Sequence, residues 1–333
     1  MASTPHHVLS IPINFVSRIR AHIAILRIDH WTKNIFILPG VVVPLSVSHT
    51  PLDGALAWRL FIGTMATCSI ASSNYVLNEI LDAPYDRLHP IKHKRPVACG
   101  LVNVPIAYVQ WLLLLAIGIA LAAQVSVPLM WILGTLWLMG CIYNVPPIRS
   151  KDVVYLDVFS EAANNPLRML AGWYMVTTTI FPPASLLISY WMIGGYLMAL
   201  KRFSEFREIH DQGRAQTYRK SFRRYSELSL LVSVMFYAAS SMLFLGAFIV
   251  RYRVELILSF PFVALVMAIY FHLAFDENSA AQNPERLHLH RTLMVSVTLC
   301  AMVMTALLFL DIPNLQRIFA PTMPLHGLTR LVQ

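Results

Sequence analysis

Hydrophobic runs of helical length recur along the whole chain, and they constrain its fold more than any other feature. They cover residues 35–47, 56–77, 104–123, 127–143, 153–180, 184–200, 228–250, 256–275 and 293–310. About 20 helical residues cross the hydrocarbon core of a bilayer, because each residue adds about 1.5 Å. The first run is short and contains Pro39 and Pro44. We predict an all-α integral membrane protein with about nine transmembrane helices.

The composition agrees with a single polytopic membrane domain that extends over residues 1–333. Of these residues, 57% are hydrophobic and only 13% are charged, which is too apolar for a soluble protein with an ordinary surface. The four cysteines are far apart and form no Cys-x-x-Cys pair, so we predict neither a disulfide framework nor a zinc site. Residues 1–17 lack the apolar core and cleavage site of a signal peptide, so we expect a mature N-terminus.

The distribution of lysine and arginine predicts the orientation in the membrane, because cytoplasmic loops collect these residues. An N-terminus on the inside gives these cytoplasmic segments: 1–26, 82–103, 144–152, 201–227 and 276–291. They hold most of the 26 lysines and arginines, whereas Arg251, Arg253, Arg317 and Arg330 lie near the outer ends. The net charge of +9 therefore needs no nucleic acid as a partner, and the basic face also favours anionic lipid. We expect the active site to face the cytoplasm, at the plasma membrane if the source is bacterial.

Three oxygen-bearing side chains stand at four-residue spacing where the second run ends: Asn78, Asp82 and Asp86. On a helix this spacing places Asn78 and Asp82 on one face, although Pro84 should bend or end the helix near Ala83. Carboxylate and amide oxygens suit Mg²⁺. We predict all three as metal ligands, and Asp82 and Asp86 also as catalytic residues. The alternative is a polar cap where a membrane helix leaves the lipid.

The loop that follows this motif is strongly basic. Its cations are Arg87, Lys92, Lys94 and Arg95. Arginine and lysine side chains hold phosphate through charge-assisted hydrogen bonds. We therefore predict that the metal binds part of the substrate phosphate and that these four residues bind the rest of it.

Two further cytoplasmic segments contribute candidate substrate-binding residues. Lys33 and Asn34 follow Trp31 closely, and the alternative for this segment is a plain interfacial anchor. Tyr143 and Lys151 flank the loop after the fourth run. We expect both pairs to lie at the same cytoplasmic face as the Asn/Asp motif.

Charged residues also occur within the fifth apolar run, residues 153–180. Asp157 and Glu161 are four residues apart, and Arg168 follows seven residues later, so all three can face the interior of the bundle. A charge within the membrane is costly and marks a candidate functional site. We predict Asp157 as a substrate-binding residue, with a purely structural ion pair as the alternative.

The sixth run ends in a further group of acids and bases. Lys201 and Glu205 share a helical face, and Arg202 lies between them. We predict Lys201 and Arg202 as phosphate-binding residues and Glu205 as a catalytic residue that orients a cation or a hydroxyl. His288 and His290 lack a third ligand with zinc spacing, so we assign them to a loop.

These motifs resemble the UbiA superfamily of membrane prenyltransferases. The resemblance rests on Asn78-x-x-x-Asp82-x-x-x-Asp86, on the following Arg-x-His-Pro-x-Lys-x-x-Arg-Pro loop and on the nine runs. Within the superfamily, Arg27-x-x-x-Trp31-x-Lys33-Asn34 and Leu200-Lys201-Arg202-Phe203-x-Glu205 are similar to the branch that contains decaprenyl-phosphate phosphoribosyltransferase. The resemblance implies a bundle with a cytoplasm-facing polar cavity that opens sideways to lipid.

The sequence departs from the common family pattern at two places. Glu79 follows Asn78 where relatives commonly carry aspartate. Relatives that act on aromatic rings carry a second Asp-x-x-x-Asp motif between the sixth and seventh spans, whereas this chain has Glu205, Glu208 and Asp211. The second departure favours the phosphoribosyl branch.

The predicted function is transfer at a polyprenyl phosphate or diphosphate with Mg²⁺ as cofactor. In the preferred reaction, a polyprenyl phosphate oxygen attacks phosphoribosyl diphosphate and diphosphate leaves. The alternative enzyme ionises a prenyl diphosphate and alkylates an aromatic or other acceptor. A transporter is the distant alternative, because carriers place their acids near the middle of the bilayer and often show repeated halves. Here the acids gather at one membrane face, and no repeat is evident.

Overall fold

The computed structural model describes residues 15–48, 50–87, 92–208, 220–276, 279, 281–282, 287 and 289–320. Within these ranges the regular secondary structure is entirely helical. The first half contains α1 (Phe15–Ala24), η1 (Ile28–Ile37), α2 (Leu38–Val47), α3 (Gly54–Asp86), η2 (Lys92–Lys94), α4 (Val104–Val125) and α5 (Val127–Asn144).

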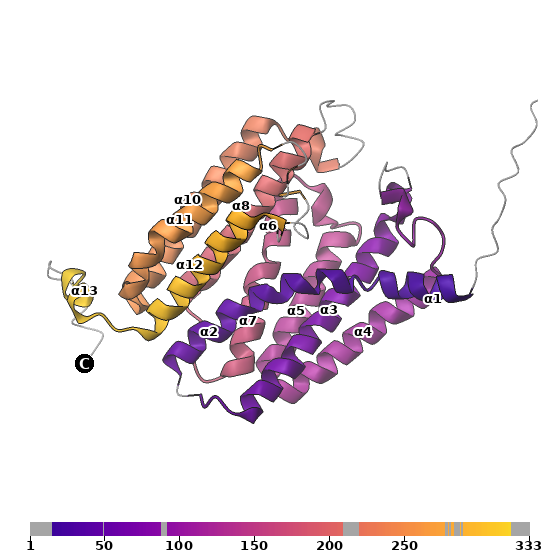
Figure 1. Cartoon of the computed structure of the whole chain (residues 1–333). Coiled ribbons are helices and arrows are strands. Elements are labelled where there is room, and N and C mark those ends of the chain that lie inside the picture. The colour runs from indigo at the N-terminus through magenta and orange to yellow at the C-terminus, as the bar shows by residue number, and fades with distance from the viewer. Residues whose placement is uncertain are drawn as a thin grey trace, which may run out of the picture.

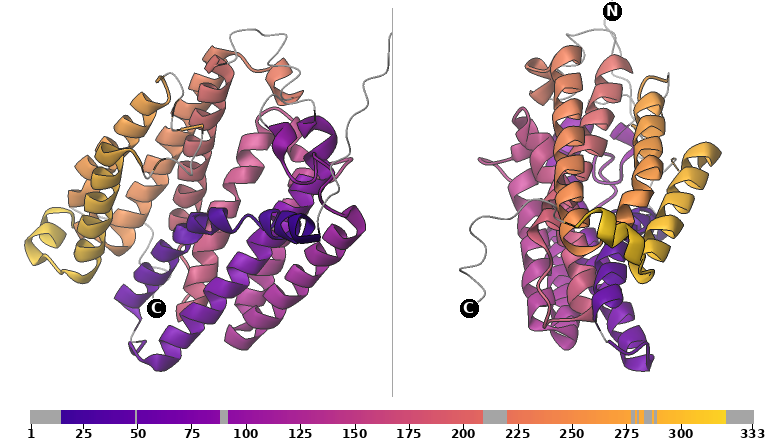
Figure 2. Two further views of the ribbon diagram at one scale, coloured as in Figure 1. Left: turned by 45° about the vertical axis from the view of Figure 1, so that its right-hand side comes forward. Right: turned by 90° about the vertical axis from the view of Figure 1, so that its left-hand side faces the viewer.

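The second half begins with a short 3₁₀ turn that leads into a broken helical segment. Its elements are η3 (Ser150–Asp152), α6 (Leu156–Ala162), α7 (Asn164–Val176), α8 (Ala184–Glu208), η4 (Lys220–Arg223), α10 (Glu227–Tyr252), η5 (Val254–Ser259), α11 (Phe260–Leu273), α12 (Arg291–Phe309) and α13 (Pro313–Ile318). Figure 1 shows α3, α4 and α5 together on one side of the bundle and α10, α11 and α12 together on the other. The left view of Figure 2 also shows these two groups apart.

Seven helical segments of the described chain are long and apolar enough to cross a membrane. They are α3, α4, α5, α8, α10, residues 254–273 and α12. The other two predicted runs form shorter pieces. Run 35–47 becomes the end of η1 and the ten-residue α2, and run 153–180 is divided into α6 and α7. The all-helical membrane fold is thus confirmed, whereas the count of nine spans stays a prediction.

Local sequence explains where the long helices begin. The Asp53 side chain accepts a hydrogen bond from the Leu56 N–H at 2.8 Å at the start of α3, and Asn103 and Ser126 cap α4 and α5 in the same way. Such caps satisfy N–H groups that have no partner within the helix. At the other end, α3 continues through Pro84 to Asp86. It does not end near Ala83, so the Asn/Asp motif stays on one helix.

The two short pieces pack closely onto the long helices. A Cβ atom added to Gly40 would lie 1.8 Å from the Met169 carbonyl oxygen, and one added to Gly172 would lie 2.3 Å from that of Ile37. Glycine therefore permits the backbones of α2 and α7 to touch, as small residues do where membrane helices meet. This packing of α7 on α2 fixes the broken segment α6–α7, which follows the loop that carries Lys151.

Large apolar side chains cover the outer faces of the bundle. Leu113 on α4, Met235 on α10 and Val295 on α12 are all more than half exposed. A continuous apolar surface of this kind is unusual for a soluble monomer, and it is the surface that lipid requires. Polar side chains gather instead where α3 and α5 end and η3 begins.

Candidate active site

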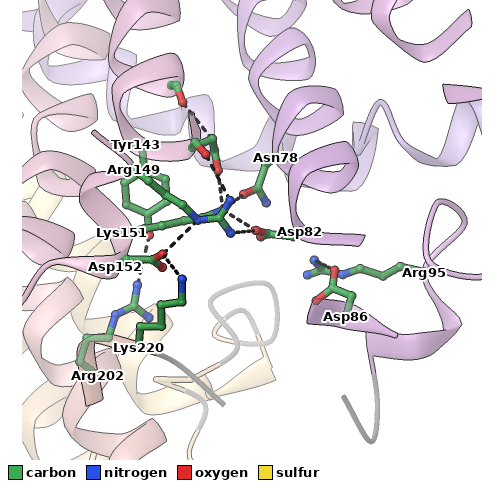
Figure 3. A network of polar contacts seen from close by, with 12 residues as sticks. Asn78, Asp82, Asp86, Arg95, Tyr143, Arg149, Lys151, Asp152, Arg202 and Lys220 are labelled. Carbon is green, nitrogen blue, oxygen red and sulfur yellow. Dashed lines mark hydrogen bonds and ion pairs between the residues drawn. The ribbon is translucent and has the colours of Figure 1, made fainter. Parts of the chain in front are cut away.

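The centre of the candidate site is the ammonium group of Lys151, which is buried at the start of η3. Its Nζ atom lies 3.1 Å from Asn78 Oδ1 and 2.5 Å from Asp82 Oδ1. The third partner is Asn144 Oδ1 at 2.7 Å, from the last residue of α5. Figure 3 shows the Asn78, Asp82 and Lys151 side chains pointing toward one another. Three oxygens from two helices thus surround one cation.

A second cation shares the Asp82 carboxylate. The Arg149 guanidinium contacts Asp82 Oδ1 at 3.0 Å and Asp152 Oδ2 at 3.2 Å. It also lies over the Tyr85 ring, 4.9 Å from the centroid. Lys220 completes this group from η4, with its Nζ 3.4 Å from Asp152. We name Asp82, Arg149, Lys151, Asp152 and Lys220 the charge cluster; it holds three cations and two carboxylates.

The backbone of the loop between α5 and α6 adopts a conformation that ordinary residues avoid. Arg149 has φ 29° and Tyr155 has φ 65°. Non-glycine residues in such regions cost about 1–3 kcal/mol each, and they persist only where their surroundings fix them. The ion pairs of Arg149 with Asp82 and Asp152 supply that restraint, so the loop is held against the end of α3.

A second polar group forms around Asp157, which is completely buried on α6. Its carboxylate accepts hydrogen bonds from Tyr225 Oη at 2.7 Å and Ser221 Oγ at 3.2 Å. The Arg202 guanidinium lies 3.3 Å from Asp157 and 2.8 Å from Glu205. Burial, followed by the nearby Asp157 carboxylate, raises the pKa of the Tyr225 phenol, so Tyr225 remains a hydrogen-bond donor at neutral pH.

Arg202 connects this group to the charge cluster. One of its terminal nitrogens lies 3.5 Å from Tyr143 Oη, and Lys151 Nζ lies 5.8 Å from the centroid of the Tyr143 ring. Since Asp157 is enclosed by its own partners, its contacts favour the structural alternative: it joins α6 to α8 and to η4. Glu205 is near the same site through Arg202, and Lys201 Nζ lies 4.0 Å from its carboxylate.

The motif on α3 is divided between two sets of partners. Asp86 pairs with Arg95 at 2.8 Å, and Figure 3 shows this pair apart from Asp82 and Lys151. Glu79 is buried, and its carboxylate accepts a hydrogen bond from the Val97 N–H at 3.4 Å. Asp86 and Glu79 thus hold the basic loop, while Asn78 and Asp82 face the charge cluster.

Similarity to known proteins identifies the family of this chain. The sequence profile of the UbiA prenyltransferase family matches residues 35–294. The chain belongs to this family. The matched range contains α3, α5 and η3, and with them every residue of the charge cluster.

Relatives of this UbiA family member carry several names. Nodulation protein NoeC of Azorhizobium caulinodans is 31% identical over 59% of this chain and 61% of its own length. A decaprenyl-phosphate phosphoribosyltransferase of Corynebacterium glutamicum is 28% identical over 60% of this chain and 58% of its own. The chain thus spans about three fifths of the length of these two relatives.

Solved structures support the fold of this UbiA family member. A UbiA homologue from Archaeoglobus fulgidus, bound to GPP and Mg²⁺, aligns with a TM-score of 0.65 at 17% identity. The alignment covers 87% of this chain and all of that protein. At this identity the similarity establishes the shared helical bundle.

The remaining predicted residues lie on η1, at the end of α3 and on η2. Lys33 Nζ lies 6.0 Å from the centroid of the Tyr75 ring. The Asn34 side chain donates a hydrogen bond to Cys68 Sγ and accepts one from Arg168 Nε. Arg87 donates to the Ala98 carbonyl at 3.3 Å. Lys92 and Lys94 lie on η2. Asp211 and His288 lie outside the described residues, and His290 caps α12.

Sequence reasoning about this UbiA family member missed Arg149, Asn144, Asp152 and Lys220. Arg149 and Lys220 lie in predicted cytoplasmic segments, but neither was predicted as a site residue. Asn144 stands next to Tyr143, and Arg149 stands two residues before Lys151, so proximity to predicted residues was the available signal. Arg149 contacts Asp82, and Asn144 contacts Lys151, only because of the conformation of the loop, which sequence spacing does not predict.

The oxygen atoms around Lys151 fit a magnesium ion by their chemistry. No group of three His, Cys, Asp or Glu side chains that could hold a metal occurs in the described part of the chain. Two amide oxygens and one carboxylate converge instead, and Mg²⁺ is commonly held by one or two carboxylates with substrate phosphate and water. Asn78, Asp82 and Asn144 are therefore the residues that would hold it, whereas Asp86, the third predicted ligand, pairs with Arg95.

Proposed function

We propose that this protein is a UbiA-type membrane transferase that acts on a polyprenyl phosphate or diphosphate and uses Mg²⁺. The observation that supports this best is the convergence of Asn78, Asp82 and Asn144 oxygens beside Arg149 and Lys151. Oxygen ligands for a hard cation thus lie next to cations for phosphate. A polar helix cap, the alternative for this motif, has no need of partners from two other elements.

The preferred reaction is phosphoribosyl transfer from phosphoribosyl diphosphate to a polyprenyl phosphate. An oxygen of the lipid phosphate bonds to the anomeric carbon of the ribose, while the bond from that carbon to the diphosphate oxygen breaks. The diphosphate leaves with the bonding electron pair. Relatives named decaprenyl-phosphate phosphoribosyltransferase support this choice, and so does the absence of a second aspartate pair from the sequence around Glu205.

Arg149 and Lys151, two cations of the charge cluster, stabilise the leaving diphosphate in this reaction. Arg149 and Lys151 face the negative charge that develops as the bond breaks, and such interactions accelerate a reaction when they are stronger in the transition state. Bound Mg²⁺ supplies charge neutralisation at the diphosphate oxygens. Glu205, held by Arg202, orients a cation or a ribose hydroxyl. Arg87, Lys92, Lys94 and Arg95 are retained as phosphate-binding candidates at the same end of α3.

The alternative function is prenyl transfer from a prenyl diphosphate to an aromatic or other acceptor. It is supported by the family to which the chain belongs, and the same electrostatics would assist the departure of diphosphate. A transporter is a more distant alternative. Asp82 lies near the end of α3 and Asp152 lies on η3, which is unlike the midplane sites of carriers.

We also propose the orientation and the number of spans. The ends of α3, α5 and α8 that carry the site face the cytoplasm, as the distribution of lysine and arginine indicates. In this arrangement, η1–α2 and α6–α7 are the two further spans that complete nine, and the polar cavity opens sideways to lipid. The whole chain then forms one membrane domain, which lies in the plasma membrane if the source is bacterial.

Separate incubations test the proposed reaction. Purified protein with Mg²⁺ is given phosphoribosyl diphosphate and polyprenyl phosphate in one sample, and prenyl diphosphate and an aromatic acid in the other. Mass spectrometry of the lipid extract then identifies the product. Phosphoribosylated lipid in the first sample alone supports the preferred reaction, and a prenylated aromatic product in the second supports the alternative. Flux of substrate through liposomes without a covalent product would support the transporter.

A further inference from the structure

The Lys151 ammonium occupies the position among the oxygens of Asn78, Asp82 and Asn144 that a divalent cation would take. We propose that Lys151 is an internal competitor of the metal, so that metal and an anionic diphosphate bind synergistically. The diphosphate supplies the new partner that Lys151 needs when it leaves the oxygens. This inference rests on the proposed function, since it concerns the same metal and the same leaving group.

The geometry makes the two cations mutually exclusive. Lys151 Nζ lies 2.5 Å from Asp82 Oδ1 and 2.7 Å from Asn144 Oδ1, so these oxygens face inward toward one point. Metal–oxygen bonds to magnesium are about 2.0–2.1 Å long. A metal bound by the same oxygens would therefore overlap the ammonium group. Lys151 must withdraw before these side chains can bind a metal.

The surrounding charge makes it costly for a metal to bind while Lys151 remains nearby. Lys151 is 6% exposed, and the other cations of the charge cluster, Arg149 and Lys220, lie beside Asp82 and Asp152. The cluster has one more cation than carboxylates before any metal arrives. A divalent ion added there increases the repulsion, which is stronger in a buried site than in water. An anion that receives Lys151 removes this penalty.

The consequence is a coupling between two ligands. Metal binding frees Lys151 to hold diphosphate, and bound diphosphate keeps Lys151 away from the metal ligands. Such coupling is reciprocal, and coupling between sites is typically about 5-fold to 150-fold in affinity. It ensures that the site is assembled for catalysis only when the leaving group is present. Lys151 would then occupy the metal ligands when diphosphate is absent and bind phosphate when diphosphate is present.

Binding of Mn²⁺ to the full-length protein in lipid nanodiscs tests the proposal. Electron paramagnetic resonance measures the free Mn²⁺, with and without inorganic diphosphate, and protein-free titrations correct for chelation by diphosphate. For the wild type we expect diphosphate to increase Mn²⁺ affinity at least about tenfold. Equal affinity with and without diphosphate would overturn the proposal, and this comparison needs no variant.

Variants assign the coupling to Lys151. We expect Lys151→Met to bind Mn²⁺ without diphosphate at least about tenfold more tightly than the wild type, with most of the diphosphate effect lost. Arg207→Met is the control, because Arg207 pairs with Glu227 outside the charge cluster, and it should keep the wild-type coupling. Unchanged affinity and coupling in Lys151→Met would overturn the proposal.

Two further measurements separate this inference from the proposed function. Asp82→Asn should abolish the tight Mn²⁺ signal, which shows that the signal comes from this site. Thermal unfolding confirms that each variant is folded, and Lys151→Gln replaces Lys151→Met if the latter is not. Loss of coupling with intact product formation would remove only the competitor role of Lys151. Wild-type protein that forms no product but shows the coupling would contradict the proposed function instead.

Discussion

Lys151 Nζ and Asp82 Oδ1 lie 2.5 Å apart, although 69 positions separate the two residues in the sequence. This contact joins the end of α3 to the turn η3. It places a phosphate-binding candidate directly on a metal-ligand candidate. The candidate site is therefore a mixed group of acids, amides and bases rather than a cluster of acids.

Replacement of Asp82 by asparagine should lower turnover by about 100-fold or more while the yield of folded protein stays near that of the wild type. Asparagine preserves the shape of the side chain, but it removes the charge that holds metal, and losses of this size are typical where one group that stabilises a transition state is removed. Turnover measured against Mg²⁺ concentration, beside a thermal unfolding curve, checks this expectation. Full wild-type activity in excess chelator would exclude the metal assignment.

Arg149 should be as important for turnover as Lys151, although its position in the sequence did not mark it as a site residue. Arg149→Met removes the guanidinium that bridges Asp82 and Asp152, and we expect turnover to fall about 100-fold. Arg149→Lys should restore only part of it, because lysine lacks the planar fork that contacts two carboxylates. Steady-state kinetics of both variants check this. Activity of Arg149→Met near that of the wild type would remove this residue from the site.

Glu205 distinguishes the two enzymatic reactions. If phosphoribosyl diphosphate is the donor, Glu205→Gln should reduce turnover strongly, and Glu205→Asp should recover little. The shorter side chain draws the carboxylate away from Arg202, which lies 2.8 Å from it, and displacement by about 1 Å can cost about 100-fold. If a prenyl diphosphate is the donor, Glu205→Asp should be tolerated.

Both Glu205 variants are therefore assayed with both donors. Glu208→Gln serves as a control, because Glu208 is exposed at the end of α8. Near-wild-type phosphoribosyl transfer by Glu205→Gln would remove the main reason to prefer the phosphoribosyl branch.

Apolar runs of helical length predicted the long helices, because each of these helices has a nearly continuous apolar sequence. These runs did not reveal the break between α6 and α7, which falls at Ala163, just before Pro166. A proline has no backbone N–H to continue the helical hydrogen bonds. Spacing on one helix placed Asn78 beside Asp82. It could not show that Asp86 pairs with Arg95, or that the loop after α5 brings Asn144 and Arg149 to the same point.

Labelling of introduced cysteines tests the orientation. In a Cys99→Ser background, which removes an exposed native thiol, His93→Cys and Leu289→Cys should react with a membrane-impermeant reagent from the cytoplasmic side. Val127→Cys should react from the opposite side, since it begins α5 at the other end. Leu289 is chosen because it is 68% exposed, whereas Ser279 in the same predicted loop is 1% exposed. Labelling of all three from one side would contradict the proposed topology.

The most direct test of the central claim follows the ribose. Wild-type protein in nanodiscs receives Mg²⁺, polyprenyl phosphate and phosphoribosyl diphosphate labelled in the ribose, and the label in the lipid phase is compared with the diphosphate released. We predict that labelled lipid and diphosphate appear in equal amounts, and that Asp82→Asn loses both. Diphosphate release from a prenyl diphosphate with an aromatic acceptor, together with no transfer of ribose label to lipid, would contradict the account.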